Sequence, residues 1–236
     1  MAHGGAGLLL LIDGRLPAGG YAHSGGLESA IRTGRVRDTA DLGHFLTGRV
    51  RTTGAMNAAF AAAACATLSR SAEPEADPDD QRQALNRLVL LDAELDARTP
   101  SPALRKVSHA LGRQLLRALK AVNPHPLQQR MPQRTNHPVA FGAGAAMLDL
   151  APVDAARGVL HEAVSGPASA VVKLMSADPF DAYRVIADLR GVLDEIAQDA
   201  ADRAWDEPRD LPSFGAPLSD HLAEVHETRE ARLFAS

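Results

Sequence analysis

Apolar residues recur three and four positions apart along most of this chain, and this spacing limits its possible folds more than any other feature. The segment that starts near Asp38 shows it well, with Leu42, Phe45, Leu46 and Val50 on one helical face. No segment of the sequence alternates apolar and polar residues over the length of a strand, and no β-hairpin dipeptide separates two apolar runs. The spacing therefore predicts an all-α protein.

The composition supports close packing between helices. Only 4% of the 236 residues are aromatic while 45% are hydrophobic, so Ala, Leu and Val must fill the core. A chain of this length buries enough surface for one large domain. We predict a single-domain helical bundle of about eight to ten helices over residues 8–217. Residues 1–7 are expected to be disordered, and residues 218–236 to form a C-terminal partner-binding tail.

Caps, prolines and apolar spacing place the expected helices along the chain. They cover 8–13, a short helix capped by Ser24, 38–68 with a kink at Gly54, 81–97, 102–122 capped by Ser101, 137–150, 152–166, 168–176, and a helix that starts at 178 and carries Ile196. Residues 69–80 are expected to form an acidic loop, and 123–136 an exposed connection. Residues 166–167, Gly-Pro, are expected to end a helix.

Charge and cysteine content exclude several functional classes. A net charge of −4 argues against a nucleic-acid-binding surface, which needs clustered cations. The longest apolar stretch near the N-terminus is far shorter than the roughly 20 residues of a membrane span. The start of the sequence lacks the cationic segment of a signal peptide, so we expect a cytoplasmic protein. The single cysteine, Cys65, cannot form an internal disulfide or a multi-cysteine metal site, and we expect a packed, inert thiol.

A glycine-rich loop, residues 16–31, is the most distinctive stretch of the sequence. It holds four glycines, a proline, Tyr21 and the pair His23-Ser24. A small hydrolase that uses His23 and Ser24 is one interpretation. The nucleophile motif Gly-x-Ser-x-Gly is absent, however, and Ser24 as a helix cap is the simpler hypothesis.

Two further motifs suggest ligand binding but fit packing or association better. Gly142 and Gly144 begin a dinucleotide-like pattern that lacks its third glycine, so close helix packing is expected there; no phosphate-loop motif occurs. His221 and His226 are five residues apart, which separates them by about 140° around a helix. A metal contact by these histidines would need a second copy of the chain.

Lys173 and the C-terminus indicate association. Lys173 lies within an apolar segment, where it either extends to solvent or forms an interface charge. Leu233 and Phe234 stand almost at the end of the chain, and exposing each costs about 1.5–3 kcal/mol. Either they fold back on the protein, or a partner orders them.

Four blocks of the sequence together resemble the urease accessory protein UreF family. They are residues 16–28, the segment Ser-His-Ala-Leu-Gly at 108–112 with its continuation to 116, the segment His-Pro-Val-Ala-Phe-Gly at 137–142, and the ending His226-Glu227 followed by Arg-Leu-Phe-Ala-Ser at 232–236. They occur in the family's order and span nearly the whole chain.

The resemblance implies an all-α homodimeric scaffold that has no catalytic activity and no cofactor of its own. Such a protein bridges UreD/UreH and the GTPase UreG, modulates the GTPase, and assists nickel insertion into the urease apoprotein. Tyr21 and Lys173 match positions that bear on the GTPase, and Arg232 matches a tail arginine that binds UreD/UreH. The partner-binding residues expected from these blocks are Tyr21, His23, Glu28, Lys173, Arg232, Leu233, Phe234 and Ser236. A nickel-binding metallochaperone that uses His221 and His226, and the small hydrolase, remain the alternatives.

Overall fold

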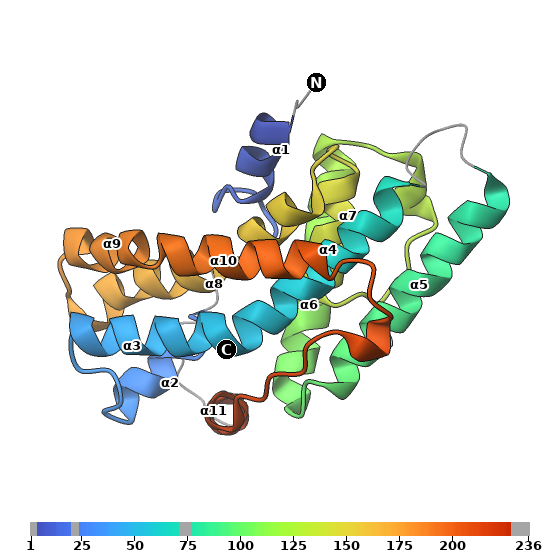
Figure 1. Ribbon diagram of the computed structural model, residues 1–236. Coiled ribbons are helices and arrows are strands. Elements are labelled where there is room, and N and C mark those ends of the chain that lie inside the picture. Colours follow the sequence, from blue (N-terminus) through green and yellow to red (C-terminus); the bar gives the residue numbers. More distant parts are fainter. Residues whose placement is uncertain (1–3, 20–23, 71–76, 228–236) are drawn as a thin grey trace.

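Every regular element is helical in the part of the chain that the computed structural model describes, residues 4–19, 24–70 and 77–227 (Figure 1). The α-helices are α1 (Gly4–Leu11), α2 (Leu27–Arg32), α3 (Thr39–Arg49), α4 (Ala55–Ser69), α5 (Pro78–Ala97), α6 (Pro102–Val122), α7 (His137–Ala146), α8 (Pro152–Met175), α9 (Pro179–Asp188), α10 (Arg190–Asp202) and α11 (Pro217–Glu227). A π-helical turn covers Val50–Gly54, and 3₁₀ turns cover Pro126–Gln129 and Pro208–Asp210. The all-α prediction is confirmed.

Helix α4 forms the centre of the molecule and packs against α5, α7, α8 and α10 (Figure 1). Its alanine run, residues 58–64 apart from Phe60, is fully buried together with that phenylalanine. Helix α7 approaches so closely that a Cβ on Gly142 would lie 2.1 Å from the carbonyl oxygen of Ala61. A Cβ on Gly144 would lie 2.4 Å from a methyl group of Leu119. The packing role predicted for these two glycines is confirmed.

The long helix expected from residue 38 is present as α3, the π-helical turn and α4 in succession. The Asp38 side chain accepts a hydrogen bond from the backbone N–H of Asp41 at 2.8 Å and caps α3. The turn ends at Gly54, where a Cβ would lie 3.1 Å from the carbonyl oxygen of Arg49. The kink predicted at Gly54 is therefore a π-helical turn, a common cause of helix bending.

Helix α8 contradicts the helix end predicted at residues 166–167. It runs without interruption from Pro152 to Met175 and contains Pro167, which is buried. Proline has no N–H, so the carbonyl of Ala163 loses its helical donor. The Arg49 side chain donates to that carbonyl at 3.1 Å instead. A contact from a distant helix therefore keeps α8 continuous.

Three further expectations are corrected. Residues 4–7 belong to α1, which starts earlier than expected, whereas 1–3 lie outside the described residues. The expected helix from residue 178 is divided at the buried Leu189 into α9, which packs on α3, and α10, which packs on α4. The 123–136 connection is not fully exposed, because Leu127, Thr135 and Asn136 are buried.

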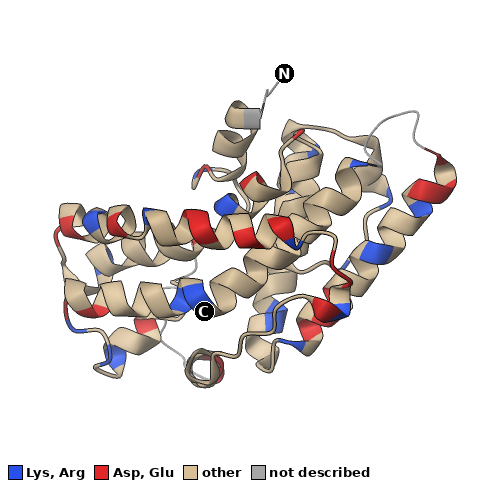
Figure 2. Cartoon of the chain, viewed as in Figure 1, with Lys and Arg blue, Asp and Glu red and all other residues tan. Residues whose placement is uncertain are grey.

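Charges of both signs are distributed over the helices, and Figure 2 shows acidic residues along α10. Helix α11 begins at Pro217, where the tail was expected to begin, and packs on α2 and α6. The boundaries of the three predicted regions stay predictions. Within the described ranges no helix combines the length and apolar content of a membrane span.

Candidate docking site at the glycine loop

The glycine loop turns sharply into α2 through two left-handed residues, Gly25 (φ 60°) and Gly26 (φ 87°). Just before them, Ser24 is buried, and its hydroxyl accepts a hydrogen bond from the backbone N–H of Glu28 at 3.3 Å. That N–H belongs to the first turn of α2, so Ser24 supports the helix start from two residues upstream of the cap position. The cap position itself is held by Gly26, which makes no side-chain cap hydrogen bond, so the prediction that Ser24 is the cap is wrong in position. His23, the catalytic partner in the hydrolase interpretation, lies outside the described residues.

Arg49 joins the glycine loop to α8. Its Nη1 donates to the carbonyl of Gly25 at 2.8 Å, and its Nε donates to the carbonyl of Ala163 at 3.1 Å. A Cβ on Gly25 would lie 2.9 Å from Arg49 Cζ, so the guanidinium occupies the space that a side chain would need. Gly25 is thus required both by its positive φ and by the close approach of Arg49. The Ala163 carbonyl is available to accept from Arg49 because Pro167 has no N–H to donate to it.

The second and third sequence blocks meet the loop at the same place. The Gln114 amide of α6 packs closely against Gly19 (φ 85°) in the loop. A Cβ added to Gly19 would lie 1.9 Å from Gln114 Oε1. Also in α6, the Ser108 hydroxyl accepts a hydrogen bond from the backbone N–H of His137 at 3.1 Å. Residues from all three blocks line one cavity of about 200 Å³, which α11 closes on another side. They include Gly25, Gly26, Ser108, Leu111, His137 and Pro138.

Glu162 precedes Ala163 on α8, and burial raises the pKa of its carboxyl group to about 8. Water still reaches 33% of its side chain, and His137 Nε2 lies 3.5 Å from its Oε2. Nearby on α8, burial lowers the pKa of His161. This part of α8 therefore holds a carboxyl group that keeps its proton at higher pH than an exposed glutamate does.

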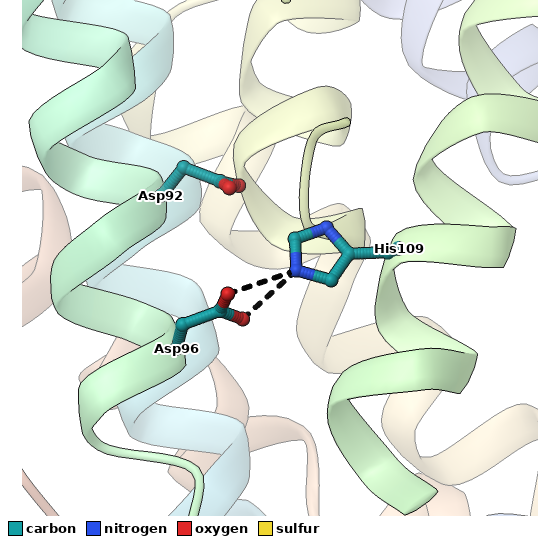
Figure 3. Close-up of side chains that lie close together, drawn as sticks. All are labelled: Asp92, Asp96 and His109. Carbon is teal, nitrogen blue, oxygen red and sulfur yellow. Dashed lines mark hydrogen bonds and ion pairs between the residues drawn. The ribbon is translucent and has the colours of Figure 1, made fainter. Parts of the chain in front are cut away.

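Figure 3 shows a second polar cluster, in which Asp92 and Asp96 of α5 face His109 of α6. The His109 Nε2 lies 2.9 Å and 3.1 Å from the two Asp96 oxygens. The backbone N–H of Asn136 donates to Asp92 at 2.5 Å, and the Asn136 amide donates to Asp96 at 3.0 Å. The cluster therefore connects α5, α6 and the start of α7.

The same three residues offer one nitrogen and two carboxylates within 4.8 Å of one another, a set that could in principle hold a divalent cation. Their oxygens, however, already accept the protein donors just described, and the cationic Arg134 lies 3.7 Å from Asp96. Burial acts to raise the pKa of Asp96, but hydrogen bonds from Asn136 and His109 outweigh it and lower that pKa. Burial raises the pKa of Asp92. We interpret the cluster as a junction between helices.

His109 is buried, and its Nδ1 has no hydrogen-bond partner among the residues that the structure describes. An unpaired acceptor nitrogen is less costly than an unpaired N–H, so the contact with Asp96 favours the tautomer that carries its proton on Nε2. That tautomer donates to the Asp96 carboxylate, in keeping with a structural role.

Helix α11 is attached to its neighbours by polar contacts. Its Glu224 accepts hydrogen bonds from the Ser101 hydroxyl and, at 3.0 Å, from the backbone N–H of Ala103 at the start of α6. The Ser101 bond is the main cause of a lowered pKa for Glu224. Lys106 pairs with Glu227 at 2.6 Å. Helix α11 therefore fixes the chain immediately before residue 228, from which the sequence continues to Arg232 and the terminal block.

The two α11 histidines do not form a shared surface. His226 is buried, and its Nδ1 lies 3.3 Å from the Ser29 hydroxyl of α2, whereas His221 is exposed. The pair therefore offers no common ligand face in the single chain. This geometry favours a packing role for His226 over the metallochaperone alternative.

The structure describes only two of the residues expected to bind partners. Lys173 is exposed near the end of α8, and no described carboxylate lies within 4.0 Å of its ammonium group. Glu28 is buried and lies 3.5 Å from Arg32, so in the single chain it can support partner binding only through the position of α2. The others, Tyr21, His23, Arg232, Leu233, Phe234 and Ser236, lie outside the described residues, and their roles stay predictions.

Sequence reasoning missed Arg49 and Glu162. A signal for Arg49 was present, because a proline inside an apolar helical pattern leaves the carbonyl four residues earlier without a donor. The sequence does not say which side chain supplies that donor. Cys65 was predicted correctly: it is fully buried, donates to the Leu150 carbonyl, and has a pKa raised to about 12 by burial.

Comparison with known proteins gives a consistent result. The UreF family model matches residues 36–190. The chain is 38% identical over 231 residues to the urease accessory protein UreF of Mycolicibacterium vanbaalenii, which covers 98% of both chains. It is 38% identical to the UreF of a Mycobacterium species, strain JLS, and 36% identical to that of Mycobacterium tuberculosis H37Ra, with 97% of each chain covered in both cases.

Proposed function

Because this chain belongs to the UreF family of urease accessory proteins, we propose that it is a non-catalytic scaffold for urease maturation. In this proposal it bridges UreD/UreH and the GTPase UreG and assists nickel insertion into the urease apoprotein. It acts in the cytoplasm as a homodimer and needs no cofactor of its own.

One observation carries this proposal: the first three of the four blocks that resemble UreF proteins, though far apart in the sequence, line one cavity. Helix α2 packs on both α8 and α11. The loop with Tyr21 precedes α2, Lys173 lies on α8, and the tail with Arg232 follows α11. A single rigid framework thus supports the three segments that the resemblance assigns to partners.

The proposed mechanism is indirect: the scaffold positions UreG and does not hydrolyse GTP itself. The sequence has no phosphate-loop motif, so the scaffold influences GTP hydrolysis only through UreG. A dimer would hold two UreG subunits in a defined arrangement, and the nucleotide state of UreG would control when nickel is released. Arg49 would keep the glycine loop in its docking conformation without touching UreG itself.

Co-purification tests this proposal. The tagged full-length chain should retain UreD/UreH and UreG together when all three are co-expressed. A variant without residues 232–236 should keep its helical circular dichroism but retain less UreD/UreH. Failure of the native chain to form the ternary complex, with every protein soluble, would contradict the scaffold function. A large fall in the thermal stability of the truncated chain would instead assign Leu233 and Phe234 to its own core.

A further inference from the structure

The guanidinium of Arg49 is a half-buried cation that has no counter-ion among the described residues. Its two hydrogen bonds go to neutral carbonyl groups, those of Gly25 and Ala163. No described carboxylate lies within 4.0 Å of it, and its Nη2 donates to no described atom. Burial lowers the pKa of Arg49, and no neighbouring carboxylate opposes that effect. Partial burial removes some of the water that would hydrate this charge, so an anion beside it would be stabilised.

The cavity described above lies directly against this guanidinium. Besides Arg49, its lining carries the neutral polar side chains of Thr53, Asn57 and Ser108 and the ring of His137. The other arginine in the lining, Arg98, already has its charge balanced by Glu94. Asp220 is the one carboxylate in the lining that the structure describes, and burial raises its pKa.

We propose that Arg49 and this cavity form a binding site for a carboxylate anion. The free Nη2 supplies a charge-assisted donor, and the neighbouring hydroxyl and amide groups can satisfy the remaining oxygen lone pairs. The inference goes beyond the proposed function and depends on this chain alone.

The size of the cavity limits the ligand. Drug-sized ligands occupy pockets of roughly 300–1,000 Å³. A cavity of about 200 Å³ fits a small carboxylate with a few waters, or one acidic side chain inserted from a docked protein. Both sources present the same chemistry to Arg49. Because Nε and Nη1 already donate to carbonyls, Nη2 would bond one oxygen of the carboxylate. The second oxygen distinguishes this ligand from chloride, since it can accept from a hydroxyl or amide of the lining.

Acetate is the probe that tests the site. Nitrogen NMR of the full-length chain with labelled arginine identifies the Arg49 side-chain signal by its loss in Arg49→Lys. Acetate then replaces chloride at constant ionic strength. We expect a saturable shift of the Arg49 signal in the native chain. In Arg51→Lys, the matched change at an exposed arginine one residue beyond Val50, the affinity for acetate should stay the same.

Two variants separate binding from folding. Arg49→Lys, followed through the Gly25 and Asn57 amide signals, should bind acetate about tenfold more weakly, because lysine lacks the Nη2 donor. Ala216→Phe adds bulk to the lining at a residue that makes no hydrogen bond with Arg49, and should weaken acetate binding similarly. An Arg49 signal that does not respond to acetate in the native chain would overturn the proposal. Equal affinity in the native chain, Arg49→Lys and Ala216→Phe would also overturn it.

The same signal distinguishes the source of the carboxylate. In the complex with UreD/UreH and UreG, loss of the acetate response together with a shifted Arg49 signal indicates a side chain of a partner in the cavity. An unchanged acetate response in the complex indicates a free anion. Both results keep the site, whereas failure of the complex to form concerns only the scaffold function.

Discussion

At the scale of single residues, the Arg49 side chain links two unusual backbone positions, one inside α8 and one just before α2. Pro167 leaves the Ala163 carbonyl without a donor, and Gly25 turns its own carbonyl inward from a left-handed conformation. Arg49 donates to both carbonyls. Each of the three residues is therefore explained by the other two, which makes the arrangement open to a double-mutant test.

Arg49→Met should lower the free energy of unfolding by about 1–3 kcal/mol, because two partly buried carbonyls lose their donors. In a Pro167→Ala background, the backbone N–H of residue 167 can donate to Ala163, so the same change should cost about 1 kcal/mol less. Urea unfolding of the four chains measures this coupling. An Arg49→Met cost that is identical in both backgrounds would show that Pro167 and Arg49 are independent.

Glu162 should make stability depend on pH in the direction opposite to most carboxylates. Its pKa is about 8 in the folded chain against 4.5 in the unfolded one, so folding takes up a proton between these values. Stability must therefore fall as pH rises from 4.5 toward 8, since the folded state binds more protons than the unfolded state. Glu162→Gln removes this loss, so the variant should gain stability relative to the native chain as pH rises.

Urea unfolding of both chains at several pH values on either side of the Glu162 pKa measures the difference. Because 33% of the side chain is exposed, solvent screening reduces the size of the effect, and its direction is the prediction. A stability difference between the two chains that does not change with pH would show that this carboxyl is ionised in the folded chain throughout the range.

At the scale of elements, small side chains decide which helices can touch. Helices α4 and α7 come together because Gly142 faces the Ala61 backbone. Helix α6 receives the 123–136 connection because a Cβ on Gly112 would lie 2.1 Å from the Thr135 carbonyl oxygen. These glycines are spacers whose absent side chain sets the distance between elements.

Gly142→Ala should destabilise the chain by about 1–3 kcal/mol, since backbone atoms cannot move aside as a flexible side chain can. Gly48→Ala is the matched control: Gly48 lies in α3, is exposed, and a Cβ added to it would have no described atom within 4 Å. This control should be neutral or stabilise the helix by up to about 1 kcal/mol. Thermal unfolding compares them, and equal effects of the two substitutions would refute the spacer role of Gly142.

The attachment of α11 should fail in acid before the core does. The lowered pKa of Glu224 means that its hydrogen bonds contribute stability fully above its unfolded value of 4.5. That contribution is lost as pH falls through the lower folded value. Glu224→Gln should mimic the acid form and increase amide hydrogen exchange in α11 while α4 stays protected. Unchanged exchange in α11 would show that its apolar contacts suffice.

At the scale of the whole molecule, the sequence predicts what is local and misses what is distant. Asp38, Ser101 and Asp178 were recognisable caps, and each accepts a hydrogen bond from the first turn of its helix. The continuity of α8 was not predictable from Pro167, because its remedy is Arg49, whose partner Ala163 lies 114 residues further along the chain. The glycine loop was recognisable as a motif, but the cavity it shares with Ser108 and His137 arises only on folding.

The binding of UreG to the preformed complex of this chain with UreD/UreH tests the scaffold function most directly. Isothermal titration would compare the native chain with Lys173→Ala and with Lys120→Ala, which removes an exposed lysine from α6. We predict that UreG binds the native complex, that Lys120→Ala binds it equally well, and that Lys173→Ala weakens binding by about tenfold or more, as expected for a charged interface contact. No binding of UreG to the native complex, or equal binding by all three chains, would contradict this account.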